Sequence, residues 1–463
     1  MLKWFQQHKT PLLFAVILSL LYWSFAYQLV RSDFVKLITL YAALFYLTHL
    51  LIKIQGWNFW ILAVLGFFFR LLFFPAIPNL SQDFYRFLWD GQLMAQGYSP
   101  YLFTPSDYIK DPSAFGVVIS QASQLLDGMG SLNGSHFSNY PPVNQLFFAL
   151  AGVGMGSSIL KGAMILRLLL ILADVGILYF GSKLLKSLNL PKHLIFWYFL
   201  NPFVIIECTG NLHFEGMMVF FLIAGLYVLQ KNKWGISAIL WGLSIIAKLI
   251  PLMFLPLLHQ WFVKQNRSFK KGILNLIGFY VMVGLVIAVS FAPFYSKPFF
   301  NNYTTTTALW FQDYEFNASV FYIVRWIGFQ TVGWDPIQTA GKILPVIVFL
   351  FITGMGFLRK NNSLSSLLTA MLFSISFYLL LATTVHPWYL ITPLTVCLFT
   401  KYRFPIVWSA TVMLSYSAYG ENGVAENPWL IALEYLTVAG FALWEIGWRK
   451  VKPQKPMLDW QNT

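Results

Sequence analysis

The sequence predicts an all-α polytopic membrane protein with about 14 transmembrane helices of roughly 20 residues each. Hydrophobic residues make up 58% of the 463 residues and charged residues only 10%. An ordinary soluble domain has about 45–50% apolar and about 25% charged residues. Apolar runs separated by Lys and Arg recur along the chain. These observations argue against a soluble, disordered or nucleic-acid-binding protein.

The balance of charge also fits a membrane protein. The 31 Lys and Arg residues exceed the 17 Asp and Glu residues, and the formal net charge is +14. Basic residues gather in cytoplasmic loops and contact anionic lipid, so we expect the lipid bilayer, and no nucleic acid, as a partner. Cys208 and Cys397 lie in apolar stretches, which argues against a disulfide scaffold and a thiolate metal cluster.

Residues 1–77 are predicted to form the N-terminal spans. Three apolar runs occur there, at 11–30, 34–52 and 57–77. The first run is long for a signal peptide and lacks an obvious cleavage site of small residues, so we expect a retained span. Because the residues before it are basic, the N-terminus is placed in the cytoplasm and the chain after the third span lies outside.

Residues 78–142 are predicted to form a large extracytoplasmic loop. This segment has 65 residues with five acids and two bases, so it is net negative in a strongly positive protein. Loops of this length in compact proteins are usually functional or disordered. Trp89, five tyrosines and amphipathic runs such as 84–96 predict an ordered loop with helices that lie on the membrane surface.

Residues 143–463 are predicted to form the rest of one integral membrane bundle. Basic clusters recur from Lys183 onward, and placing them all in the cytoplasm leaves an apolar hairpin between each consecutive pair. The outer apices are then 208–215, the neighbourhood of Lys248, a second external loop near 295–341, 383–386 and 420–427. The Gly-rich run 152–156 predicts a helix that is short, broken or re-entrant.

The first candidate for chemistry is Asp83, just after the third predicted span. Asp83 and Asp90 are seven residues apart and share one helix face, with Arg86 between them. A carboxylate held at the membrane surface could take a proton from a sugar hydroxyl as a general base. The alternative is an amphipathic surface helix in which Asp and Arg only pair with each other.

A second constellation of polar residues is Glu207, Asn211, His213 and Glu215. Acids within membrane helices are costly and usually face a cavity or a partner, so these residues predict a polar cavity that contacts substrate. The alternative is a hydrogen-bonded turn between two spans. His213 and Glu215 could ligate a divalent cation, but their spacing is no recognised metal signature.

Lys248 and His386 are two further donors at predicted outer apices. The positive-inside rule does not favour a lysine there, and an ammonium at that depth could hold a phosphate of a lipid-linked substrate. The alternative for Lys248 is snorkelling to the interface, and a lone histidine is more often structural. Asp174, in the middle of a span, is interpreted as a structural anchor of the bundle.

Several short motifs follow one another in a recognisable order. They are 83–91, 97–101, 140–142, Arg167 with 174–176, Asn201-Pro202 with Glu207, Gly210-Asn211 with His213, Lys248 with Pro251, and 386–389. In this pattern the chain resembles the integral-membrane glycosyltransferases of the GT-C superfamily. More narrowly, it is similar to bacterial mannosyltransferase-like enzymes that use a polyprenyl-phosphate sugar donor.

The resemblance implies roles for the candidate residues. Asp83 would be the catalytic base, and Lys248, His386 and Arg86 would bind the donor phosphate. Asp90, Tyr140, Glu207, Asn211, His213 and Glu215 would contact substrate. The family's loop often has two neighbouring acids, whereas Gln82 precedes Asp83 here. Asp90 or Glu207 could supply the second acid, and use of Mg²⁺ or Mn²⁺ stays open without being required.

The predicted function is therefore an inverting glycosyltransferase in the cytoplasmic membrane. It would move a sugar, mannose by the resemblance, from a polyprenyl-phosphate donor to a glycan or glycolipid acceptor on the extracytoplasmic side. One alternative is a flippase or other transporter of lipid-linked oligosaccharides, which needs charged groups along a path through the bundle. The other is a polysaccharide polymerase or ligase, which differs in its donor.

Overall fold

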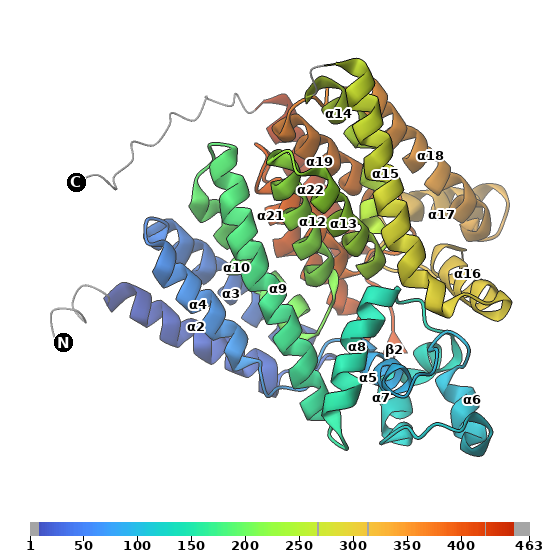
Figure 1. The fold of residues 1–463 in the computed structure, drawn as a ribbon. Coiled ribbons are helices and arrows are strands. Elements are labelled where there is room, and N and C mark those ends of the chain that lie inside the picture. The colour runs from blue at the N-terminus through green and yellow to red at the C-terminus, as the bar shows by residue number, and fades with distance from the viewer. Residues whose placement is uncertain (1–8, 266–267, 313, 422, 449–463) are drawn as a thin grey trace.

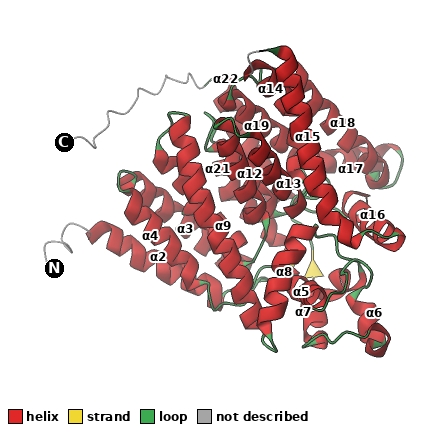
Figure 2. Cartoon of the chain, viewed as in Figure 1, coloured by secondary structure: helices red, strands yellow, loops and turns green. Residues whose placement is uncertain are grey.

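Helices make up almost all of the regular structure. The structure is a computed structural model, and it describes residues 9–265, 268–312, 314–421 and 423–448. In these residues the strands are the antiparallel hairpin of β1 (Tyr419–Gly420) and β2 (Gly423–Val424), drawn in yellow in Figure 2. The expected all-α class is confirmed.

The helices follow the chain in four groups (Figure 1). The first group is α2 (Lys9–Gln28), α3 (Phe34–Gln55) and α4 (Phe59–Leu72). The polar segment then carries α5 (Asp83–Ala95), α6 (Pro105–Lys110), η1 (Pro112–Phe115) and α7 (Ala122–Ser135). The third group is α8 (Pro142–Met155), α9 (Ile159–Ser187), η2 (Lys192–Ile195), α10 (Phe196–Phe199), α11 (Pro202–Val204), η3 (Ile205–Gly210), α12 (Glu215–Gln230), α13 (Trp234–Ala247), η4 (Ile250–Leu258), α14 (His259–Gln265), α15 (Phe269–Phe291) and η5 (Ala292–Phe294). The last group is α16 (Lys297–Gln312), α17 (Val320–Thr331), α18 (Ile337–Phe357), α19 (Leu364–Leu381), η6 (Pro387–Leu390), α20 (Ile391–Cys397), α21 (Phe404–Thr411), η7 (Val412–Ala418) and α22 (Pro428–Gly447).

Fewer helices than the expected 14 are long and apolar enough to cross a membrane. Seven described helices meet both conditions: α2, α3, α9, α15 with η5, α18, α19 and α22. An eighth span results if α12 is joined to the segment 202–210 before it, at a bend of 114°. Four shorter apolar stretches, such as the 14-residue α8 and α13, account for much of the difference, because a helix of that length covers only about 21 Å.

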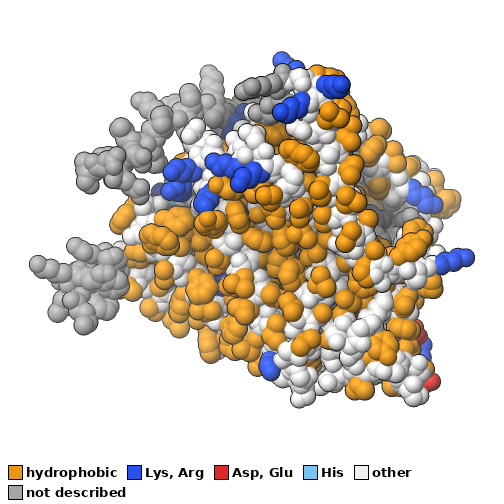
Figure 3. Space-filling model, viewed as in Figure 1, with side chains coloured by type: hydrophobic (Ala, Val, Ile, Leu, Met, Phe, Trp, Pro, Cys, Tyr) orange, Lys and Arg blue, Asp and Glu red, His pale blue; other side chains and the backbone are white. Residues whose placement is uncertain are grey.

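The surface of the molecule fits a lipid environment. Large apolar side chains are exposed on helices that would face lipid, as Trp60 at 76% and Val64 at 64% on α4 illustrate. On the face drawn in Figure 3, apolar side chains form a broad band. Most Lys and Arg side chains on that face lie at its upper end, opposite the acidic side chains at the lower end. The protein is therefore a multi-pass membrane protein.

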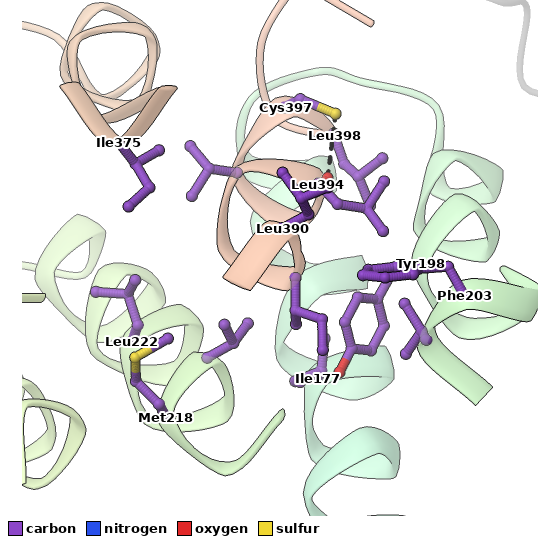
Figure 4. Packing of buried hydrophobic residues seen from close by; sticks show 14 of the residues in the cluster. Ile177, Tyr198, Phe203, Met218, Leu222, Ile375, Leu390, Leu394, Cys397 and Leu398 are labelled. Atoms are coloured by element: carbon purple, nitrogen blue, oxygen red, sulfur yellow. Dashed lines mark hydrogen bonds between the residues drawn. The ribbon is translucent and has the colours of Figure 1, made fainter. Parts of the chain in front are cut away.

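The main apolar core lies where α9, α12, α19 and α20 meet. Figure 4 shows Ile177, Leu222, Ile375 and Leu394 pointing toward one another from these helices, and all four have fully buried side chains. Cys397 belongs to this core, with its Sγ 3.1 Å from the carbonyl oxygen of Leu394. Both cysteines are free and buried, as their apolar surroundings predict.

A buried ion pair joins the N-terminal helices to this core. The Arg70 guanidinium on α4 donates to the Asp174 carboxylate on α9 at 2.7 Å, and both side chains are 0% exposed. The Tyr198 hydroxyl also donates to Asp174, at 2.6 Å. Asp174 is thus the structural anchor that its position in a span suggests. Arg167 instead donates to the carbonyl oxygens of Phe74, Thr209 and Gly210.

The polar segment docks onto the bundle through close contact between α5 and α8. A Cβ atom at Gly91 would lie 2.0 Å from the carbonyl oxygen of Phe148, and one at Gly152 would lie 2.3 Å from the carbonyl carbon of Gly91. Around this contact, Phe87 of α5 stacks on Phe148 at 4.4 Å between ring centroids. The Gly-rich run therefore lets two helix backbones touch, and α8 is as short as the sequence suggests.

Gly152→Ala is expected to destabilise this docking. The added methyl group has no room between two backbones, and overpacking of this kind costs about 1–3 kcal/mol. Thermal unfolding of the detergent-solubilised protein measures the effect as a lower Tm. Gly440→Ala on α22 is the control because nothing lies within 4 Å of its Cβ position. An equal Tm for Gly152→Ala and wild type would contradict the close approach.

Candidate active site

A broken helix gathers four of the predicted polar residues. Segment 202–210 and α12 meet at the 114° bend, and η3 within it is a π-helix, a form that often marks functional sites. Leu212 takes a positive φ of 64° at the break, a conformation that costs energy in a residue with a side chain. The break carries the side chains of Glu207, Asn211, His213 and Glu215, all of which are buried within the protein. With Asp83, Lys248 and His386 they form a polar cluster.

Glu207 and Asn211 are held by neighbouring segments. The Tyr416 hydroxyl donates to Glu207 Oε1 at 2.9 Å, and His213 Nε2 lies 3.4 Å from Glu207 Oε2. Asn211 Oδ1 accepts from the backbone N–H of Leu80 at 3.2 Å, which fixes the start of the polar segment against the break. Among the residues that the structure describes, no group of three or more His, Cys, Asp or Glu side chains is arranged to hold a metal ion.

A stack of three rings connects the break to the C-terminal part of the chain. Trp388 lies between two imidazoles, 3.6 Å from His213 and 4.5 Å from His386 between ring centroids. Burial, helped by the positive charges of Lys248 and Arg31, lowers the pKa of His386 to about 3. His386 is therefore neutral at physiological pH and offers one N–H as a donor.

Lys248 pairs with Glu215 beside this stack. Its ammonium forms an ion pair with the Glu215 carboxylate at the first residue of α12, and Nζ lies 4.5 Å from the centroid of the Tyr389 ring. Lys248 ends α13, where it adopts extended backbone angles that turn the chain. The structure thus brings together Lys248, Glu215 and the His386 segment, as the sequence predicts.

Asp83 lies at the first residue of α5, and its carboxyl group is partly buried. Asn133 of α7 donates to Asp83 Oδ1 at 3.3 Å. Burial raises the pKa of Asp83 above its ordinary value of 3.8, whereas the Asn133 hydrogen bond and the Lys248 charge lower it. The positive charge of Lys248 therefore acts on Asp83.

Arg86 and Asp90 are placed differently from the other candidates. They form a buried ion pair of 2.7 Å on one face of α5. Asp90 also accepts hydrogen bonds from Ser138 and Gln145, at 2.5 and 3.0 Å. The carbonyl oxygens of Asn133 and His136 accept from Arg86. The structure does not bring this pair into contact with Lys248 or His386, and the pair stabilises the fold of the polar segment.

Tyr140 lies between the polar segment and α8. Its ring packs edge-on against Phe87 and Phe148, at 4.9 and 5.6 Å between centroids. Burial and the neighbouring Asp83 carboxylate raise the pKa of Tyr140 well above its ordinary value. Its hydroxyl therefore stays protonated near Asp83 and can act as a donor.

The predicted second external loop also reaches the His386 segment of the polar cluster. Its residues form α16, α17 and the segment between them, in which Phe316 pairs as a parallel bridge with Thr384. The Phe316 N–H donates to the Thr383 carbonyl, and the Val385 N–H donates to the Phe316 carbonyl, at 3.1 and 2.8 Å. Phe316 then lies 5.1 Å from His386 between ring centroids.

The sequence analysis did not single out Arg31, which also acts on this polar cluster. Arg31 lies between α2 and α3, and its guanidinium carbon is 3.3 Å from the centroid of the Tyr419 ring. Its charge acts on Asp83 and His386. The positive-inside rule could have found it, because Arg31 falls at an outer apex of the predicted topology, as Lys248 does.

Comparisons with known proteins identify the family. The family described as "Alpha-(1->6)-mannopyranosyltransferase, N-terminal domain" matches residues 15–264, more than half of the chain. The chain therefore belongs to the alpha-(1->6)-mannopyranosyltransferase family, and the resemblance to membrane mannosyltransferases is confirmed. The matched part includes Asp83, Glu215 and Lys248, whereas His386 lies beyond it.

One curated relative matches as well. The chain is 25% identical over 194 residues to alpha-(1->6)-mannopyranosyltransferase A of Mycobacterium tuberculosis. The match covers 42% of this chain and 35% of the relative, so the chain spans about a third of the length of the relative it matches. No solved structure matches the chain.

Proposed function

We propose that this protein transfers mannose from a polyprenyl-phosphate donor to a hydroxyl of a glycan or lipid-linked acceptor. The reaction takes place at the outer face of the cytoplasmic membrane and inverts the anomeric centre. The observation that carries the proposal is a partly buried carboxyl group, Asp83, on which the charge of Lys248 acts, while Lys248 itself lies over the Tyr389 ring beside the His386 stack. Membership of the mannosyltransferase family supports the choice of sugar.

The proposed reaction follows from the charged groups and the hydrogen-bond donors of the polar cluster. The acceptor oxygen attacks the anomeric carbon and forms the new glycosidic bond, while the bond from that carbon to the phosphate oxygen breaks. Asp83 takes the proton of the acceptor hydroxyl, and the electron pair of the broken bond leaves with the polyprenyl phosphate. Lys248 and His386 stabilise this departing anion more than the bound donor, which accelerates the reaction.

The surroundings of the polar cluster suggest how the polyprenyl-phosphate donor lies. An apolar groove lined by Leu344, Val348 and Tyr378 of α18 and α19 ends at Thr384 and Tyr389. The isoprenoid chain would lie in this groove, because its inner end meets the ring over which Lys248 sits. The phosphate would then reach the outer end of α13 at headgroup depth.

The other predicted contacts divide into two groups in this proposal. Tyr140, Asn211 and His213 bind the sugar or the acceptor. Glu207 positions His213, and Glu215 positions Lys248. Arg86 and Asp90 act as positioning residues because their hydrogen bonds order the segment that presents Asp83.

A donor assay tests the proposal. The purified protein in proteoliposomes is given polyprenyl-phosphate [³H]mannose or GDP-[³H]mannose, together with a mannan-type acceptor extract. We expect label in the acceptor from the polyprenyl donor alone, because an apolar groove that suits an isoprenoid chain ends at Tyr389, the ring over which Lys248 lies. NMR of the product is expected to show the anomeric configuration opposite to that of the donor.

Three outcomes would contradict the proposal in whole or in part. Label transferred from GDP-mannose alone would replace the lipid-linked donor with a nucleotide sugar. Movement of a lipid-linked glycan across the bilayer without a new glycosidic bond would favour a transporter. Retention of the donor's configuration would remove the single-displacement step and leave the transferase class intact.

A further inference from the structure

Arg31, which is partly buried, differs from the other cations near the polar cluster in its partners. Its guanidinium lies flat over the Tyr419 ring at 3.3 Å, a contact that holds the planar group by its face. The buried Nε atom has no hydrogen-bond partner. Throughout the described part of the chain, no carboxylate lies within ion-pair distance of Arg31. Its positive charge is therefore not neutralised by a carboxylate, and its Nε donor is available to a ligand.

The other cations near the polar cluster already form ion pairs with carboxylates. Lys248 pairs with Glu215, Arg86 with Asp90 and Arg70 with Asp174. A phosphate that approached Lys248 alone would meet a pair whose net charge is close to zero. Arg31 adds a positive charge without a carboxylate partner to the same cluster, and its field reaches both Asp83 and His386.

We propose that Arg31 is the principal phosphate-binding residue of the polar cluster. An arginine edge forms two parallel N–H···O bonds with a phosphate, which fixes its orientation as well as its position. The Tyr419 ring that holds the guanidinium lies 5.7 Å from Phe316 between centroids, and Phe316 lies 5.1 Å from His386, so Arg31 is placed near the His386 segment. The inference rests on the proposed function, because it names the residue that binds the phosphate of the polyprenyl-phosphate donor.

The alternative is that Arg31 only ties the two ends of the chain together through its contact with Tyr419. The two roles predict different measurements. A structural tie, once removed, lowers thermal stability and leaves phosphate affinity in the folded fraction unchanged. A phosphate contact, once removed, raises KM for the donor and lowers affinity for phosphate at equal stability.

Direct binding of radiolabelled polyprenyl phosphate to the purified protein tests the inference. For Arg31→Gln we expect affinity to fall about 10- to 100-fold, the usual effect of losing a hydrogen bond to a charged group. Inhibition of transfer by inorganic phosphate should weaken in parallel. Arg325→Gln is the matched control, because Arg325 lies in the second external loop and pairs with Glu315; it should bind as wild type does.

A second variant separates charge from geometry. Arg31→Lys keeps the charge but loses the two-pronged edge, so an intermediate loss of affinity is expected. If Arg31→Gln does not fold, Arg31→Lys decides the matter, and wild-type affinity in that variant overturns the inference. Wild-type affinity in a folded Arg31→Gln overturns it too, while the proposed function stands. If the wild-type protein neither binds polyprenyl phosphate nor uses the mannosylated donor, the proposed function fails first.

Discussion

Asp83→Asn is expected to lower kcat by about 10²- to 10⁴-fold, the usual contribution of a general base. The amide has nearly the size of the carboxylate, so the contact with Asn133 and the start of α5 are kept. KM for the donor should change little, because Asp83 acts on the acceptor proton. Initial rates of mannose transfer, measured at saturating donor and acceptor, give the effect.

Asp107→Asn provides the control for this experiment. Asp107 lies on α6 in the same polar segment and pairs at the surface with Lys110, so its substitution should leave transfer unchanged. Protein yield and Tm of both variants must match those of the wild type. Unaltered transfer by a folded Asp83→Asn protein would remove Asp83 from the role of base.

The pH dependence of transfer gives a second measure of the same residue. A base must be deprotonated to act, so the rate falls as the pH falls through the pKa of Asp83. Burial raises that pKa above 3.8, and the acid limb should lie above this value. Asn133→Leu removes a hydrogen bond that stabilises the carboxylate, so the limb should move to higher pH. No movement of the limb would mean that another group controls it.

Arg70→Met is expected to cause the largest loss of stability. It leaves the Asp174 carboxylate buried without its cation, and removal of one partner of a buried ion pair costs about 3–5 kcal/mol. Thermal unfolding in detergent, followed by the loss of monodisperse protein, measures the change. The variant should accumulate poorly in membranes because the contact joins α4 to α9.

Two comparisons make this result specific. Lys110→Met breaks the exposed pair with Asp107, where both side chains are more than half exposed, and such pairs contribute less than about 1 kcal/mol. The double variant Arg70→Met/Asp174→Asn should recover part of the loss, since no unpaired charge is left in the core. A Tm for Arg70→Met equal to that of Lys110→Met would contradict the importance of the buried pair.

The sequence predicted the class of the fold, and the grouping of Lys248, Glu215 and His386, better than the course of individual helices. Hydrophobic composition depends on total apolar content, so it identified a multi-pass bundle. It could not distinguish a full span from the 14-residue α4, which lies within the run 57–77 that was predicted to span, because both are largely apolar. The 114° bend at 211–214 arises from packing against Tyr416, Leu80 and Trp388, residues far away in the chain.

Contacts of individual side chains also differ in how far the sequence predicts them. The spacing of Arg86 and Asp90 at i and i+4 indicated that they could pair, and they do. The contact of Lys248 with Glu215 joins two helices whose register no local pattern determines. Arg31 acquires its surroundings from Tyr419, nearly the whole chain away. Local spacing predicts partners on one helix, whereas contacts between distant segments require the assembled bundle.

The Arg31–Tyr419 contact and the Trp388 stack limit how this protein could be divided or recombined. The segment shared with the family, 15–264, supplies Arg31 and His213, and the later part of the chain supplies Tyr419 and Trp388, the rings on which they lie. A fragment that ends at 264 would lack both rings. A chimaera that exchanges the first half between relatives would inherit the base and need matching rings from the second half.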